Sequence, residues 1–450
     1  MISSIQSSPL IRALRFLVFL APFTAVVVYH KTLFPFIVGK FTFFRFLMEV
    51  ALIVLLWAWA NGDLKRFFER TKLEGMKVLF KNPIVIAVSV FVLMFLLAGM
   101  FGVNPSASFW SNYERGEGGF QLIHLYVFFL SLVMLFQDEA SWRKFFGISL
   151  IAGGVVLLYG TLGALGVYGF EKTSFCNRFG GSLGNPAYLG TYLIFMLFYT
   201  GYLWFSRGKI KKNWFLWGAL ALLWSVFLLL TQTRGALIGL GAGVIFALLY
   251  LSWVASSWRS RGALLGAVAI LVGLGTLGVI YREHIDLMPF CSDTGGNRIL
   301  NIAFETETYQ TRLALWKGSW GAFLDRPLFG WGPENFSIAI ERNFQPELSS
   351  AWFDRAHNIF FDYLAMTGLM GLLSFLSLFL AIFFLVLKHS KKVFVAVASW
   401  RYTNALVLGV VAAYLTQGLV LFDVLPIYLN VFTVLAFVTW KYSSTHQQSV

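Results

Sequence analysis

Long stretches without a single charged residue are the feature that most restricts the fold of this chain. Residues 83–112 and 155–170 contain no Asp, Glu, Lys or Arg, and only 12% of the 450 residues are charged, against 58% that are hydrophobic. About 20 apolar residues allow a helix to cross the hydrocarbon core of a bilayer, which is roughly 30 Å thick. Soluble domains are about 25% charged. A water-soluble globular fold is therefore excluded, and the chain is predicted to be an all-α, polytopic integral membrane protein.

Hydropathy predicts about 12 transmembrane helices, with one long extracytoplasmic loop between the ninth and the tenth. Residues 1–281 form spans 1–9, residues 282–366 form the loop with short helices, and residues 367–450 form spans 10–12 and a cytoplasmic tail. The predicted spans are residues 10–29, 42–60, 83–101, 120–136, 145–163, 186–205, 214–232, 235–254, 262–281, 367–387, 403–421 and 426–441.

Basic residues are distributed unevenly between the two faces of this topology. One face carries 21 of the 35 Lys and Arg residues. Loops rich in Lys and Arg remain in the cytoplasm during membrane insertion, so both termini are predicted to be cytoplasmic and the long loop to lie outside. The net charge of +14 follows from this rule and does not indicate a nucleic-acid partner.

Arg234 is the first candidate for substrate binding. It opens the eighth predicted span at its outer end, where free N–H groups and the positive end of the helix dipole lie beside the guanidinium. This combination favours a phosphate. Gly235, Gly239 and Gly243 follow at four-residue intervals and predict a smooth face for close helix packing. The alternative is an interfacial arginine that contacts lipid headgroups.

Arg178 is a second candidate. It precedes a glycine-rich segment that ends in Asn185 and Pro186, which together form a strong helix start because Asn caps the helix and Pro fits its first position. An arginine and a helix N-terminus again meet on the predicted outer face. A flexible turn with a solvated arginine is the alternative.

His357, just before the tenth predicted span, is the candidate general base, because an imidazole accepts a proton near neutral pH. Asp354 is three residues earlier and would hold the ring if this segment were helical. A structural histidine and a metal ligand are the alternatives. No pair of His or Cys residues has the spacing of metal ligands, so no metal or other cofactor is expected.

The only two cysteines, Cys176 and Cys291, both lie on the predicted outer face, where oxidation is permitted. A disulfide between them and two free thiols are both compatible with the sequence.

Several motifs, taken in order, resemble the bacterial O-antigen ligase and O-antigen polymerase superfamily. The main ones are Thr233-Arg234-Gly235, Arg312-Leu313-Ala314-Leu315-Trp316 with the following segment 325–336, and His357-Asn358-Ile359 with the following segment 368–371; residues 109–115 and 178–186 are also similar. Thr233 stands where serine is common, and Ser111 where glycine is common. Neither difference removes a charged group.

The resemblance implies a glycosyltransferase of the bacterial inner membrane whose active site faces the periplasm. Members take a glycan from undecaprenyl diphosphate and pass it to a lipid A core sugar, in ligases, or to another lipid-linked repeat unit, in polymerases. They are regarded as independent of metals. By position, the resemblance implies catalytic His357 and Arg234, and substrate-binding Arg178, Arg234, Arg312, Arg115 and Asn358.

Glycan transfer is also the chemistry that these residue types suit. Cleavage of a glycosyl diphosphate builds negative charge on the leaving group, which fixed guanidiniums stabilise, and attack from the opposite side would invert the anomeric centre. The predicted partners are an undecaprenyl-diphosphate-linked glycan, a lipid A core oligosaccharide or other glycan acceptor, and membrane lipids. O-antigen ligase is the first hypothesis and a polymerase of the same superfamily the second. A solute or lipid transporter is the third, although transporters usually show internal repeats.

Overall fold

The fold is all-helical throughout the part of the chain that the structure, a computed structural model, describes. That part comprises residues 8–70, 80–113, 115–206, 213–281, 307–348, 352–393 and 398–443. Its helices in chain order are α1 Pro9–Leu20, η1 Ala21–Ala25, α2 Val38–Ala60, α3 Asp63–Arg70, α5 Pro83–Met100, α6 Pro105–Trp110, α7 Gly119–Leu135, α8 Glu139–Ala164, η2 Gly181–Leu183, α9 Pro186–Phe205, α10 Trp214–Leu230, α11 Arg234–Trp253, α12 Trp258–Ile280, α13 Glu307–Asp325, α14 Phe336–Arg342, η5 Pro346–Leu348, α15 Ile359–Val393, α16 Ala398–Gly418 and α17 Leu425–Lys441.

The prediction of a polytopic membrane protein is confirmed. Seven described helices are long and apolar enough to cross a bilayer: α2, α5, α8, α9, α11, α12 and the part of α15 from Ile359 to Ser390. Three apolar helices, α7, α10 and α17, are shorter. Every predicted span overlaps a helix, while the total of twelve crossings stays a prediction.

The first predicted span, residues 10–29, is shorter as an α-helix than expected. The α-helix ends at Leu20 and continues as a 3₁₀ turn to Ala25. Pro22 lies at the start of that turn. Proline has no N–H to donate and its ring clashes with the preceding turn of an α-helix, which explains the early end.

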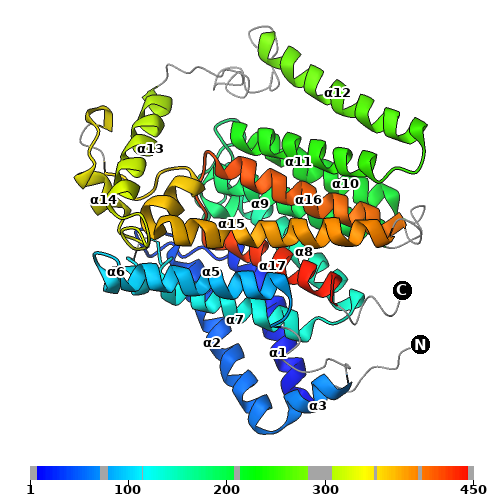
Figure 1. Ribbon diagram of the computed structural model, residues 1–450, viewed down its shortest axis with the longest axis horizontal. Coiled ribbons are helices and arrows are strands. Elements are labelled where there is room, and N and C mark those ends of the chain that lie inside the picture. Colours follow the sequence, from blue (N-terminus) through cyan, green and yellow to red (C-terminus); the bar gives the residue numbers. More distant parts are fainter. Residues whose placement is uncertain are drawn as a thin grey trace.

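The glycine face predicted for α11 is confirmed, and it packs against α16. A Cβ on Gly239 would lie 2.7 Å from the Ala413 carbonyl oxygen, and one on Gly243 would lie 2.5 Å from that of Gly409. Only glycine permits this close approach of the two backbones. Figure 1 shows α11 and α16 side by side, with α12 at the edge of the bundle, where it buries no residue.

Helix α15 breaks at Gly368, whose φ of 64° and ψ of −166° are not helical. The break leaves backbone groups without partners inside the helix, and the segment 327–332 provides those partners. Four N–H to carbonyl hydrogen bonds join the two segments: Trp331 to Ala365 (3.0 Å), Gly332 to Met366 (2.8 Å), Leu369 to Pro327 (2.8 Å) and Met370 to Leu328 (3.2 Å). Irregular backbone near a membrane is tolerated where protein satisfies it in this way.

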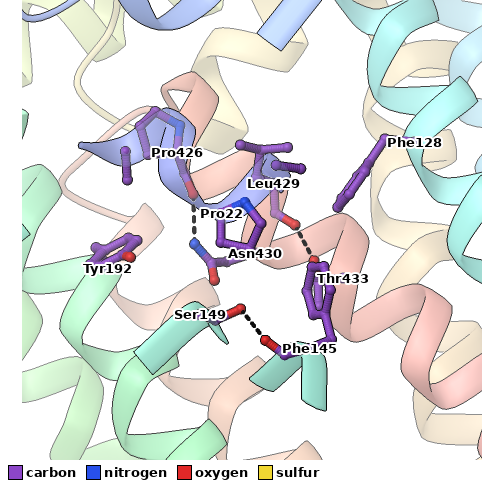
Figure 2. Close-up of a pocket in the computed structure, with 11 residues that line it drawn as sticks. Pro22, Phe128, Phe145, Ser149, Tyr192, Pro426, Leu429, Asn430 and Thr433 are labelled. Atoms are coloured by element: carbon purple, nitrogen blue, oxygen red, sulfur yellow. Dashed lines mark hydrogen bonds between the residues drawn. The ribbon is translucent and has the colours of Figure 1, made fainter. Parts of the chain in front are cut away.

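The centre of the bundle holds a small cavity of about 20 Å³, which Figure 2 shows. Two of its polar side chains donate to their own helices: Asn430 to the Pro426 carbonyl at 2.7 Å, and Ser149 to that of Phe145 at 3.0 Å. The cavity has room for about one water molecule. It is therefore part of the packed interior and too small for a substrate.

Replacing Gly368 with alanine is expected to destabilise the protein, because the new Cβ would overlap the Leu328 carbonyl and hold a side chain at positive φ. A strained backbone position of this kind costs about 1–3 kcal/mol. Thermal unfolding of the purified protein in detergent measures the effect. Gly241→Ala is the matched control, since its Cβ would meet nothing within 4 Å. Equal melting temperatures for the two variants would contradict this account of the break.

Candidate functional site

The predicted site residues lie where several helices begin, at one end of the bundle. Helices α7, α9, α11, α15 and α17 start from loops that contact one another there. Asn185 caps α9 by accepting a hydrogen bond from Ala187 N–H at 2.8 Å, as its sequence predicts. The loops before these helices carry the charged residues, so the helix starts position the charges.

The Arg178 segment is joined directly to the segment that precedes Arg234. Two hydrogen bonds form the link: Phe179 N–H to the Leu230 carbonyl at 3.0 Å, and Gln232 Nε2 to the Cys176 carbonyl at 2.8 Å. Arg178 itself is half-buried and has a φ of 58°. The structure therefore brings these two predicted anion-binding segments together, although they are more than 50 positions apart.

Cys176 lies in the same segment and is disulfide-bonded. The other cysteine of the chain, Cys291, lies outside the described residues. The sequence alone had left open whether the cysteines are oxidised. The disulfide adds a covalent restraint to the loop that contains Arg178.

The end of α16 connects the start of α11 with the rest of the site. A Cβ on Gly235, the residue after Arg234, would overlap Gln417 and Val420. Gln417 is 1% exposed, and neither its amide nitrogen nor its oxygen has a hydrogen-bond partner among the described residues. An unsatisfied buried amide is costly, so Gln417 is a further candidate for contact with a ligand.

Three ion pairs join the loops before α7, α14 and α15. Arg115 Nε donates to Asp354 Oδ2 at 2.5 Å. Arg355, which is 6% exposed, lies between two carboxylates, 2.5 Å from Glu334 and 3.4 Å from Glu117. Because these partners come from three separate stretches of chain, the ion pairs fix the shape of the whole site.

Burial and these ion pairs set the charge states of the carboxylates. Burial raises the pKa of Glu117 to about 7, although Arg355 acts in the opposite direction. Burial would also raise the pKa of Asp354, but the hydrogen bond from Arg115 and the charge of Arg355 outweigh it and lower that pKa. Near neutral pH, Asp354 is therefore charged and Glu117 is partly protonated.

His357 lies among these arginines. Its ring centroid is 5.2 Å from that of Phe422, and the Arg115 guanidinium lies 5.1 Å from the same Phe422 ring. Burial first, and then the positive charge of Arg312, lower the pKa of His357 to about 4. The imidazole is therefore neutral at physiological pH and free to accept a proton.

Helix α13 places Arg312 beside His357. Trp316 stacks on Phe361 with the ring centroids 5.7 Å apart, and its Nε1 donates to the Ala356 carbonyl at 3.1 Å. Arg312 is one turn earlier on the same face of α13. Three predicted residues, Arg115, Arg312 and His357, are thus brought together.

A small cavity beneath Arg355 is lined by four carboxyl groups, those of Glu117, Glu334, Asp362 and Asp423. Its volume of about 30 Å³ has room for one or two water molecules. Burial raises the pKa of Asp423 to about 8, so this acid is mostly protonated at neutral pH. A sugar or a diphosphate cannot enter this space, and a substrate must therefore bind outside it.

Among the described residues, no group of three His, Cys, Asp or Glu residues is arranged to hold a metal ion.

Backbone strain is concentrated at the site. Six described non-glycine residues have positive φ, and five of them lie in the segments above: Ser111, Arg178, Gln232, Glu334 and His357. Such conformations cost free energy and are found most often at functional sites. The strain marks these loops as a site that the surrounding packing holds in place.

Two details of the predicted site are different in the structure. The segment before α15 is not helical, so Asp354 pairs with Arg115 instead of holding the His357 ring. The side-chain oxygen of Asn358 accepts hydrogen bonds from Phe360 and Phe361 N–H, at 3.0 and 3.4 Å. Asn358 therefore caps α15, and its role in substrate binding stays a prediction.

Comparison with known proteins identifies the central part of the chain. Residues 219–376 match the family model of O-antigen ligase. This segment of the chain is similar to O-antigen ligases. The general O-oligosaccharyltransferase of Acinetobacter baylyi is 25% identical over 190 residues, which are 42% of this chain and 32% of that relative's own length. The resemblance to the O-antigen ligase superfamily predicted from the motifs is therefore confirmed.

The matched segment, residues 219–376, contains only part of the site. Arg234, Arg312 and His357 lie within the matched residues, whereas Arg115 and Arg178 lie before them. Reasoning from the sequence missed the acidic partners Glu117 and Glu334, and it missed Arg355 although this residue is only two positions before His357. The available signal was a charged residue, Arg355, close to a candidate base. The partners of Arg355 are 21 and 238 positions away, so the sequence did not indicate them.

Replacing Arg355 with methionine is expected to destabilise the protein, because Glu334 would be left buried without its partner. Removing one member of a buried ion pair costs about 3–5 kcal/mol. Thermal unfolding is the measurement, and Lys65→Met is the control, since the Lys65 side chain is 83% exposed and its ion pair with Glu69 is on the surface. A melting temperature equal to that of the control would show that Arg355 does not support the site.

Proposed function

We propose that this protein transfers a glycan from undecaprenyl diphosphate to an acceptor hydroxyl at the periplasmic face of the bacterial inner membrane, as an O-antigen ligase. The observation that carries the proposal is a neutral His357 in a buried junction next to Arg115 and Arg312. A base that can accept a proton, beside fixed positive charges, is what cleavage of a glycosyl diphosphate requires.

The arginines bind the leaving group in this proposal. Arg234, Arg178 and Arg312 contact the diphosphate, and the N–H groups at the start of α11 add to the positive potential. Guanidiniums are suited to this role because they remain charged and bind phosphate oxygens in pairs. The polyprenyl chain lies between helices in the membrane.

His357 removes the proton from the acceptor hydroxyl. The hydroxyl oxygen forms a bond to the anomeric carbon, the bond from that carbon to the diphosphate oxygen breaks, and the electron pair leaves with undecaprenyl diphosphate. Burial and the nearby positive charges give His357 this low pKa. A bound diphosphate adds negative charge and raises this pKa, so the imidazole becomes a stronger base when the donor is present.

The acceptor is a lipid A core sugar in this proposal, with a growing lipid-linked glycan, as in a polymerase, as the alternative. A third candidate acceptor is a protein hydroxyl, because the name of the relative, general O-oligosaccharyltransferase, specifies transfer to oxygen and no lipid acceptor. Incubation of the purified protein with a lipid-linked oligosaccharide and each of the three acceptors separates these activities. Movement of the donor across a membrane without any glycosidic bond would instead support a transporter.

Alanine at Arg234 or His357 is expected to lower transfer at least a hundredfold, because general base catalysis and electrostatic stabilisation each contribute about 10²–10³ or more in rate. Arg234→Lys is expected to remain poor, since an ammonium cannot hold two phosphate oxygens at once. The assay follows loss of the lipid-linked glycan, with membrane insertion of each variant as a control. Normal transfer by both alanine variants would exclude the mechanism.

The pH dependence tests the role of His357 separately. The pH dependence of kcat/KM reports the pKa values of groups in the free enzyme. Its acid limb is therefore expected near pH 4, instead of near the ordinary histidine value of 6.5. Arg312→Gln removes a positive charge that lowers this pKa and should shift the acid limb to higher pH. An acid limb that is unchanged in Arg312→Gln would argue against His357 as the group that titrates.

A further inference from the structure

A basic groove lies between α1 and the first turns of α8, far from the site described above. It is lined by Arg12, Arg15 and Lys144 and by the rings of Phe16 and Phe19, and it encloses about 380 Å³. Helix α7 begins two residues after Glu117 and ends at Leu135, next to the groove. Its 17 residues span about 25 Å, so the groove is at the opposite end of the bundle from the arginines around His357.

The cations of the groove are held in position. Arg15 Nη2 donates to the Leu135 carbonyl at 3.0 Å, which satisfies the C-terminal end of α7. Its Nε is buried and has no hydrogen-bond partner among the described residues. Lys144 Nζ lies 4.8 Å from the centroid of the Phe19 ring. A donor that is buried and unsatisfied is costly unless a ligand binds it.

The nearby acids offset only part of the positive charge of Arg12, Arg15 and Lys144. Asp138 attracts Arg15, but its carboxylate also caps α8 and accepts hydrogen bonds from the N–H and hydroxyl of Ser141, at 2.7 and 2.8 Å. Glu139 interacts electrostatically with Lys441, away from the groove. Arg12 and Lys144 belong to none of the ion pairs of the described residues.

We propose that this groove binds the phosphate headgroup of an anionic membrane phospholipid. Arg12, Arg15 and Lys144 contact the phosphate oxygens, and an acyl chain follows the ring of Phe16, which is 61% exposed. Basic pockets between membrane helices recognise anionic headgroups in this way, and the volume is within the usual range for ligand sites. The bound lipid would link α1 to α8 independently of glycan transfer.

Native mass spectrometry of the full chain in mixed micelles of phosphatidylcholine and phosphatidylglycerol tests the proposal. The unmodified protein is expected to retain one phosphatidylglycerol molecule in preference to phosphatidylcholine. Arg12→Gln and Lys144→Gln should each weaken retention about fivefold, because one basic residue contributes about a factor of five to binding of anionic lipid. Both side chains are exposed, so each variant should still fold.

Arg143→Gln is the matched control. Arg143 is next to Lys144 on α8 but interacts with Tyr202, on another face of the helix. Retention that is unchanged in Arg12→Gln and Lys144→Gln, or weakened equally in Arg143→Gln, would overturn the proposal. Inorganic phosphate separates the lipid from a free anion: it should displace phosphatidylglycerol only poorly, and displacement at equal concentration would exclude a lipid site.

Discussion

The buried charge of Arg355 is the constraint on which the architecture of the site depends. A guanidinium that is 6% exposed is tolerated only when carboxylates compensate it. Glu117 comes from the loop before α7, and Glu334 from the segment before α14. Arg355 therefore joins three parts of the chain, and it does so two residues before His357. The position of the candidate base follows from the need to satisfy this one cation.

The break in α15 at Gly368 also helps to position Glu334 next to Arg355. Its free backbone groups bind residues 327–332, and this segment leads directly into Glu334. Gly332 approaches Gly102 so closely that a Cβ would lie 3.0 Å from the Cα of that residue. The motif around Trp331 therefore has a structural role. It positions the carboxylate of Glu334 next to Arg355, and no contact with a substrate is assigned to it.

Local signals made much of the fold predictable, and distant partners made part of the site unpredictable. Apolar stretches identified the helices, Asn185 with Pro186 identified a helix start, and the Gly235, Gly239 and Gly243 pattern identified a packing face. The pairing of Arg355 with Glu117 depends on residues 238 positions apart, and no periodicity records such a contact. The early end of the first helix was predictable from Pro22. The break at Gly368 was not, because it depends on hydrogen bonds from residues 327–332.

The charge balance of the site explains how acids and an anionic substrate are compatible. Four carboxyl groups surround the cavity beneath Arg355, and if all were ionised they would repel a diphosphate. Burial raises the pKa of Glu117 to about 7 and that of Asp423 to about 8, so near neutral pH Glu117 is partly protonated and Asp423 is mostly neutral. Glu334 is paired with Arg355, and Asp354, in the same loop as Arg355, is paired with Arg115. The acids therefore hold Arg115 and Arg355 in place, while Arg312 adds its positive charge at His357.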